Sequence, residues 1–204
     1  MELTIFLKGL LIGFSIAAPV GPIGALCIRR SIAEGRLSGF ISGLGAASAD
    51  ALYGLIAALG LTWLSGFLVD QQMWIRLLGG LFLCYLAVAT FRSRTSSSTE
   101  SQRSPNSLAA FVSTFFLTLT NPLTILSFTA IFAGLGLSTI AGDYLSGGVM
   151  VAGVFLGSTL WWMLLSGAAG LLAPRLGTAG LVWVNRLSGL VIGVFGLAAL
   201  GSLL

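Results

Sequence analysis

The sequence predicts an all-α integral membrane protein with six transmembrane helices, arranged as two inverted three-helix repeats. Its 204 residues are 56% hydrophobic and 8% charged, whereas a typical globular sequence has about 25% charged residues. Several apolar stretches approach or exceed the ~20 residues that a helix needs to cross a bilayer. One polar segment divides these stretches into three and three, so the second half must run inverted relative to the first.

The six predicted spans form a single transmembrane domain and lie at residues 3–24, 38–62, 75–91, 108–134, 146–171 and 180–203. The polar segment 92–107 is rich in Ser, Thr and Arg, which is typical of a flexible linker. It separates a first half, 1–91, from a second half, 108–204. We expect span one to be retained and not cleaved as a signal peptide, because the charged leading region is nearly missing and Pro19 follows the small residues.

Span one contains the sequence APVGP, in which Pro19, Gly21 and Pro22 lie close together. A proline inside a helix removes a hydrogen bond and clashes with the preceding turn, at a cost of about 3 kcal/mol or more. We therefore predict that span one is broken here. In hydrocarbon, the freed backbone groups must be buried in protein or line a wet cavity. The helix that resumes at Pro22 would present free amides and the positive end of its dipole.

Span four repeats this feature at Asn121-Pro122, which is typical of the cap and first residue of a half-helix. Two half-helix N-termini, one from each inverted half, could meet near the bilayer midplane and bind a carboxylate. The alternative interpretation is a pair of ordinary proline kinks.

Small residues recur at every fourth position in spans one and two, on Gly9, Gly13, Ala17 and Gly21 and on Gly35, Gly39, Gly43, Ala47 and Ala51. This spacing forms a groove along one helix face that lets backbones approach closely in lipid. It predicts tight pairing of spans one and two. It also allows a homodimer without requiring one.

Asp50 is the one acid deep within a predicted span. An ionised acid there costs ~2.5–3.5 kcal/mol on insertion scales, so it is a candidate functional residue. We hypothesise that Asp50 contacts a substrate ammonium, carries a coupling proton, or does both. The alternative is a protonated or hydrogen-bonded structural acid.

Three further sets of residues have open roles. Trp161, next to Trp162 in span five, lines a substrate path or belongs to an aromatic belt. Arg186, about two turns inside span six, pairs with Asp50 or a substrate carboxylate, or snorkels to the headgroups. We interpret Arg29 and Arg30 as anchors at the cytoplasmic surface.

Loop charges predict the orientation. The loops after spans one, three and five are basic, whereas those after spans two and four contain Asp70 and Asp143. The positive-inside rule then places the linker 92–107 in the cytoplasm and both termini outside. The resemblance of residues 74–81 to 183–190 supports an internal repeat, which aligns Asp50 with Thr159.

Motifs along the whole chain resemble those of the lysine exporter and homoserine/threonine exporter (LysE/RhtB) family, namely Ala18-Pro19-Val20-Gly21-Pro22, Asp50, Phe115-Phe116-Leu117-Thr118, Asn121-Pro122, Gly157-Ser158 before Trp161-Trp162, and Asn185-Arg186-Leu187-Ser188-Gly189. The resemblance implies a multi-pass protein of the bacterial inner (plasma) membrane that exports amino acids or related small metabolites. It also implies an ion gradient as the energy source, with proton antiport expected. The substrate-binding residues would be Pro19, Gly21, Pro22, Asp50, Asn121, Pro122, Trp161 and Arg186.

Other classes fit less well. We expect no enzyme and no cofactor, because no nucleophile–base pair stands out, and no nucleic-acid partner, because the ten cations cluster in short loops. A metal or inorganic-ion permease stays open, although hard cations prefer several oxygen ligands and the chain has no His. A thiol–disulfide electron carrier would need Cys27 and Cys84 to meet, and a non-transporting scaffold would not need broken spans.

Overall fold

The computed structural model describes residues 2–19, 21–58, 71–92, 106–121, 124–125, 127–128, 144–176 and 178–203, and every regular element within these ranges is helical. The elements are α1 (Glu2–Ala17), α2 (Pro22–Ala33), α3 (Arg36–Ala58), α5 (Gln72–Phe91), α6 (Ser107–Leu119), α8 (Tyr144–Leu172), the short 3-10 helix η2 (Ala173–Arg175) and α9 (Thr178–Gly201). The all-α prediction is therefore confirmed for the described part of the chain.

Three segments are long and apolar enough to cross a membrane, and they are Arg36–Ile56, Tyr144–Arg175 and Ala179–Gly201. The number rises to four if α1 and α2 count as one bent span, while Arg76–Phe91 and Ser107–Leu119 are shorter apolar helices. The described residues thus establish a multi-pass helical protein with three to four clear spans. The total of six spans stays a prediction.

The predicted break in span one is confirmed. α1 ends at Ala17, α2 begins at Pro22, and the two axes differ by 82°. Pro22 takes the first helical position, where a missing N–H group costs nothing. The predicted end of the span at residue 24 is wrong, because α2 continues to Ala33. Its basic residues are accommodated by hydrogen bonds to neighbouring helices.

The second break is also present. α6 begins after Asn106, whose side chain accepts a hydrogen bond from the Ala109 amide at 3.1 Å, and it ends at Leu119. Thr120 and Asn121 are not helical. A new turn then begins, since the Ile125 amide donates to the Asn121 carbonyl at 3.2 Å. Span four is therefore interrupted at the predicted place, although Pro122 itself lies outside the described residues.

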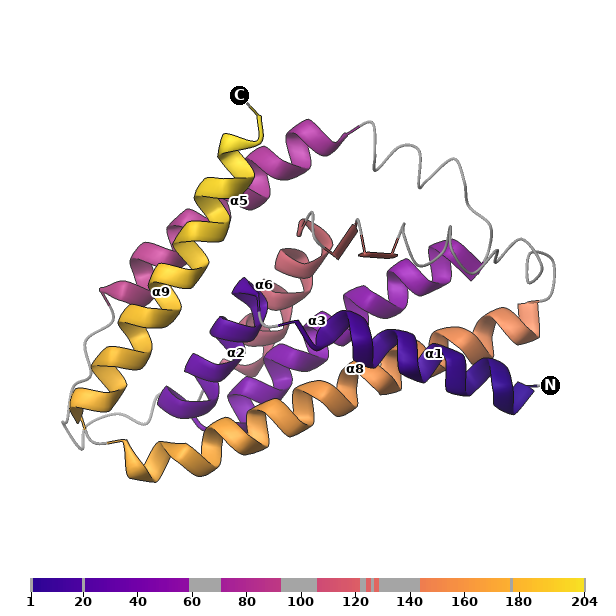
Figure 1. Cartoon of the computed structure of the whole chain (residues 1–204), viewed down its shortest axis with the longest axis horizontal. Coiled ribbons are helices and arrows are strands. Elements are labelled where there is room, and N and C mark those ends of the chain that lie inside the picture. Colours follow the sequence, from indigo (N-terminus) through magenta and orange to yellow (C-terminus); the bar gives the residue numbers. More distant parts are fainter. Residues whose placement is uncertain are drawn as a thin grey trace.

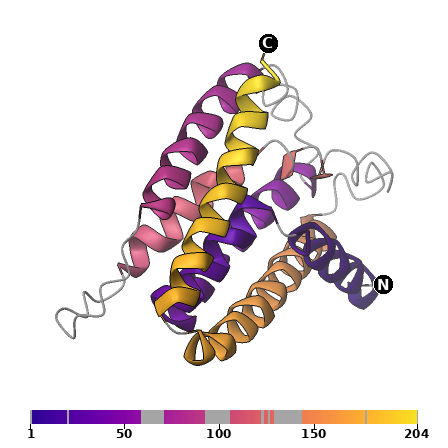
Figure 2. The ribbon, with the colours of Figure 1, turned by 60° about the vertical axis from the view of Figure 1, so that its left-hand side comes forward.

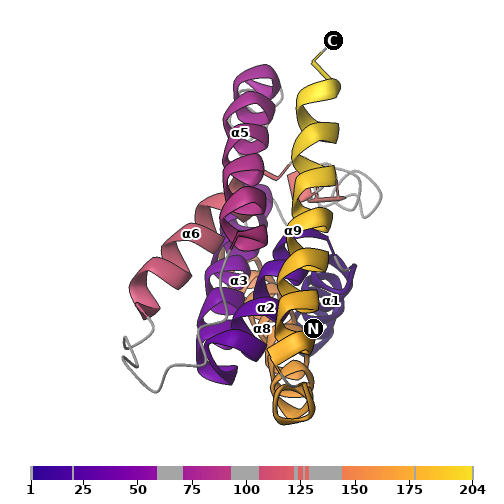
Figure 3. The ribbon, with the colours of Figure 1, turned by 90° about the vertical axis from the view of Figure 1, so that its left-hand side faces the viewer.

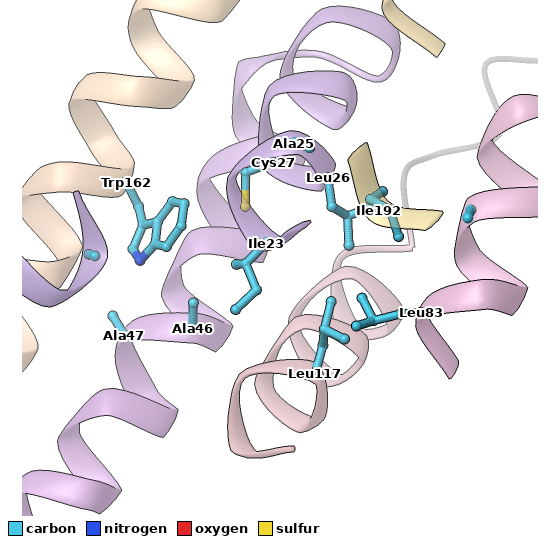
Figure 4. Close-up of a cluster of buried hydrophobic side chains, with 12 residues drawn as sticks. Ile23, Ala25, Leu26, Cys27, Ala46, Ala47, Leu83, Leu117, Trp162 and Ile192 are labelled. Atoms are coloured by element: carbon cyan, nitrogen blue, oxygen red, sulfur yellow. The ribbon is translucent and has the colours of Figure 1, made fainter. Parts of the chain in front are cut away.

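The long helices α3 and α8 pack against each other, with α1 along α8 and α6 along α3 (Figure 1). Helices α5 and α9 form a separate pair, which is visible side by side in Figure 2 and Figure 3. α2 contacts α3, α8 and α9, so it joins the pair to the remainder. Its Ile23, Leu26 and Cys27 lie within a buried apolar cluster to which α3, α5, α6, α8 and α9 also contribute (Figure 4).

The small-residue face of α1 packs on α8. A Cβ atom added to Gly9 or Gly13 would meet the backbone of Met150 or Val154. On α8, one added to Gly157 would meet the Leu10 carbonyl. The prediction that spans one and two pair through this face is therefore wrong for α1, because a small-residue stripe identifies a close-packing face without identifying its partner.

We expect Gly13→Ala to destabilise the protein by about 1–3 kcal/mol, because the new methyl group would overlap backbone that cannot move aside. Gly148→Ala is the matched control. Gly148 is helical and exposed with nothing within 4 Å of an added Cβ, so the substitution should be neutral or stabilise by up to about 1 kcal/mol. Unfolding midpoints of both variants in detergent test this, and equal midpoints would contradict the close packing.

The helix ends next to the three predicted basic loops lie at one end of the molecule. Arg29 donates to the Asn185 side chain of α9 at 3.1 Å, and Arg36 donates to the Gly170 carbonyl of α8 at 3.5 Å. The C-terminal end of α5 lies there too, because Gly189 faces Phe91. The described helix ends that flank the loops predicted to be cytoplasmic thus share one end, which we call the linker side. Which way this side faces stays a prediction.

Candidate functional site

A cavity of about 130 Å³ lies where the two helix breaks meet α3 and α8. Five of the predicted site residues line it, and they are Pro19, Gly21, Pro22, Asp50 and Asn121. They come from positions far apart in the sequence, which the fold brings to one place. Trp162 and the hydroxyl residues Thr118, Thr124 and Ser127 also line the cavity.

Asp50 is the charged group of this cavity. Its side chain is 3% exposed, and it is the one buried charged residue among those that the structure describes. The Ser158 hydroxyl of α8 donates to its Oδ2 at 2.7 Å, and the Trp162 indole N–H donates to that hydroxyl at 3.1 Å. This chain fixes one carboxylate oxygen. Asp50 also lines the cavity, so its carboxylate is held in place at the cavity wall.

Tyr53, one turn further along α3, positions the second break. Its hydroxyl donates to the Leu119 carbonyl at 2.6 Å, which satisfies one of the last carbonyls of α6. Its ring stacks on Phe128, with 5.3 Å between ring centroids. These contacts attach Leu119 and Phe128, which lie on either side of Asn121, to the helix that carries Asp50.

The first break contributes a helix N-terminus. Gly21 is the N-cap of α2, and its carbonyl accepts from the Ala25 amide at 3.0 Å. Ile23 and Gly24 belong to the first turn, where amides lack intrahelical partners, and both residues line the cavity. The positive end of the α2 dipole therefore faces the same space as the Asp50 carboxylate.

The second break contributes neutral polar groups. Asn121 is 8% exposed, and its Nδ2 donates to the Thr124 hydroxyl at 3.0 Å. Thr118, one turn before the break, donates to the Thr114 carbonyl at 2.8 Å. The cavity thus combines one carboxylate and one helix N-terminus with several hydroxyl and amide groups.

Two predicted site residues lie elsewhere. Trp161 is not among the cavity-lining residues; its ring packs edge-on against Phe14, with 5.4 Å between centroids. Arg186 is exposed on α9 and does not line the cavity either. The structure therefore brings neither Trp161 nor Arg186 to Asp50, and Trp162 takes the place expected of its neighbour.

Ser158, which the sequence analysis quoted only as part of a motif, is a partner of Asp50 that was not predicted as a site residue. It is fully buried and bonds directly to Asp50. Two signals could have found it. Its position four residues before Trp162 places both on one helix face, and the internal repeat aligned Asp50 with Thr159, the next residue.

The described residues contain no group of three His, Cys, Asp or Glu side chains that could bind a metal ion. Both cysteines are free: Cys27 is buried in α2, and Cys84 lies on α5 against Gly196 of α9. The two thiols thus belong to different contacts of the fold, and the cavity contains neither.

Comparisons with known proteins identify a family and two relatives. The family model described as "LysE type translocator" matches residues 14–202. The chain is 33% identical over 164 residues to the Bacillus subtilis (strain 168) protein named "Putative amino acid efflux protein YcgF", covering 78% of this chain and 77% of that protein. It is 32% identical over 177 residues to the "Uncharacterized membrane protein YahN" of Escherichia coli (strain K12), covering 83% and 77%. No solved structure matches the chain.

Proposed function

The chain belongs to the LysE type translocator family, and from this premise we propose that it is a secondary transporter that exports amino acids or closely related small metabolites by proton antiport. The observation that carries the proposal is the cavity beside a broken span, which Asp50 and the N-terminus of α2 both line. One relative is named for amino acid efflux, which agrees with this choice of substrate.

The cavity chemistry suits a zwitterion. The Asp50 carboxylate would bind the substrate ammonium, and the first-turn amides of α2 would bind its carboxylate, as helix N-termini do for anions. Asp50 is the one charged side chain among the cavity-lining residues of the described chain. A substrate with a further charge would leave that charge without a partner, so we propose that amino acids with uncharged side chains are preferred.

A matched packing pattern supports the inverted three-plus-three arrangement. α1 and α6 would be the leading parts of spans one and four; α1 packs on α8, and α6 packs on α3. A twofold rotation that exchanges the halves 1–91 and 108–204 would exchange these two contacts. α5 and α9 would be the exchanged third spans, and they pair antiparallel, since Gly80 faces Leu200 while Gly189 faces Phe91.

Proton coupling follows if Asp50 binds a proton or the substrate ammonium, but never both at once. When the cavity is open to the outside, the carboxylate takes up a proton and releases the ammonium. The two halves then rock about the site, as in other inverted-repeat transporters. When the cavity is open to the cytoplasm, the Asp50 carboxylate releases the proton and binds a new substrate. One proton enters for each zwitterion that leaves. The scheme assumes an inner-membrane protein with the linker 92–107 cytoplasmic and the termini outside.

The proposal is tested by efflux from cells preloaded with a panel of labelled amino acids, with and without a proton uncoupler. We expect neutral amino acids to leave at least several-fold faster than from cells without the protein, and the uncoupler to abolish the difference. Lysine and glutamate, which carry a third charge, serve as the comparison. If no member of the panel leaves faster, the assignment to amino acid export is wrong.

A further inference from the structure

Arg30, near the end of α2, is hydrogen-bonded to two other helices. Its Nη1 donates to the Ser42 hydroxyl of α3 at 2.7 Å, and to the Ala110 carbonyl and Thr114 hydroxyl of α6 at 3.0 Å each. Its Nη2 donates to the Ser113 hydroxyl of α6 at 2.9 Å. The interpretation of Arg30 as a surface anchor is therefore wrong, because its guanidinium lies between helices.

All the described hydrogen-bond acceptors of Arg30 are neutral. The nearby carboxylate of Glu34 is engaged otherwise, with Arg29 at 3.5 Å and with the Ser38 hydroxyl at 2.7 Å. Breaking a buried ion pair leaves a charge without its partner and is strongly destabilising, whereas hydroxyl and carbonyl acceptors carry no net charge when the arginine leaves. Arg30 thus holds the helices firmly, yet it can be released without separating opposite charges.

The contacts of Arg30 join the two halves of the chain on the linker side. α2 is the trailing part of the first broken span, and α6 is the leading part of the fourth. One turn from Arg30 toward the cavity lies Leu26, and one turn from Thr114 toward the cavity lies Leu117. Both leucines are 1% exposed and belong to the same apolar cluster (Figure 4). α2 and α6 therefore share an apolar cluster between the Arg30 contacts and the cavity-lining ends of the two helices.

We propose that Arg30 is the gating residue on the linker side: its bonds to α6 close the route from that side to the cavity, and they break when a substrate loads. The inference rests on the proposed function, since only a transporter needs this route to open. In the structure Arg30 bridges α2 and α6 on this side. An exporter must then separate α2 from α6 once in each cycle, and the neutral partners make that separation reversible.

Labelling of a cavity cysteine tests the gate without any substrate. The parent carries Cys27→Ala, Cys84→Ala and Ala46→Cys, because Ala46 lines the cavity. A membrane-impermeant maleimide is applied to spheroplasts and to inside-out vesicles, and Ser107→Cys, exposed at the start of α6, identifies the linker side. Arg30→Ala removes all three bonds to α6. We expect it to raise the labelling rate from the linker side about tenfold or more, since losing even one charge-assisted hydrogen bond has roughly that effect. The rate from the other side should not rise.

Arg29→Ala is the matched control, since it removes the same charge one residue away without touching α6. It should leave the labelling rates near those of the parent. Thr114→Val with Ser113→Ala provides a second route, because it removes hydroxyl partners of Arg30 and keeps the arginine; this variant should also label faster from the linker side. The gate is disproved if Arg30→Ala and this double variant label at the parent rate from both sides, or if Arg29→Ala matches Arg30→Ala. Because the assay needs no transport, it separates failure of the gate from failure of the proposed function.

Discussion

Asp50→Asn is expected to reduce amino acid export roughly 100-fold, because truncating a buried charged partner costs about 2–5 kcal/mol of binding. The amide has the shape of the carboxylate and can still accept from the Ser158 hydroxyl, so the fold should persist. It cannot carry a proton or neutralise the substrate ammonium. Any residual flux should therefore no longer respond to a pH gradient. Efflux from proteoliposomes with an imposed gradient, measured alongside the unfolding midpoint, checks both expectations.

Ser158→Ala is the comparison for this variant. It removes the hydrogen bond at 2.7 Å but leaves the charge of Asp50. It should raise the substrate concentration needed for half-maximal export while keeping the dependence on the pH gradient. Native export by Asp50→Asn, with an unchanged pH dependence, would show that Asp50 is a structural acid after all.

Much of the site could be predicted because each clue was local. Pro22 after Gly21 required a helix start whatever the rest of the fold did, since proline fits only the first turn without cost. Asp50 had to be enclosed, because lipid cannot solvate a carboxylate. These two constraints, with the matching Asn121-Pro122, were enough to predict one shared cavity.

The helix pairing and the contacts of Arg30 and Ser158 could not be predicted, because local sequence patterns do not specify which distant residues become partners. The glycines of α1 showed which face packs closely, but α8 and α3 both offer small residues, and the sequence does not choose between them. The sequence does not indicate that Arg30 is held between helices, because its hydroxyl partners on α6 lie more than 80 positions away, as the separation of 83 to Ser113 shows. It does not indicate the role of Ser158 either, because serines are common in membrane helices and only the fold places this one beside Asp50.

Ala46→Leu should also block export, for a steric reason. Ala46 lines the cavity of about 130 Å³, so three further carbon atoms would fill part of the volume that a substrate needs. Since the cavity offers space, the cost to folding should stay below the 1–3 kcal/mol typical of overpacking a dense core. We expect export to fall at least tenfold, with a nearly unchanged unfolding midpoint, as measured in the same proteoliposomes and detergent samples.

Two other alanines are controls for this prediction. Ala47 is fully buried but does not line the cavity, so Ala47→Leu should lower the unfolding midpoint itself. Ala89 is exposed on α5, so Ala89→Leu should change neither export nor stability. The same substitution would thus have three outcomes, determined by whether the added carbon atoms meet free volume, packed protein or lipid. If Ala46→Leu exported at the native rate, the space beside Asp50 would not be the substrate's route, and the transport mechanism proposed for this cavity would fail.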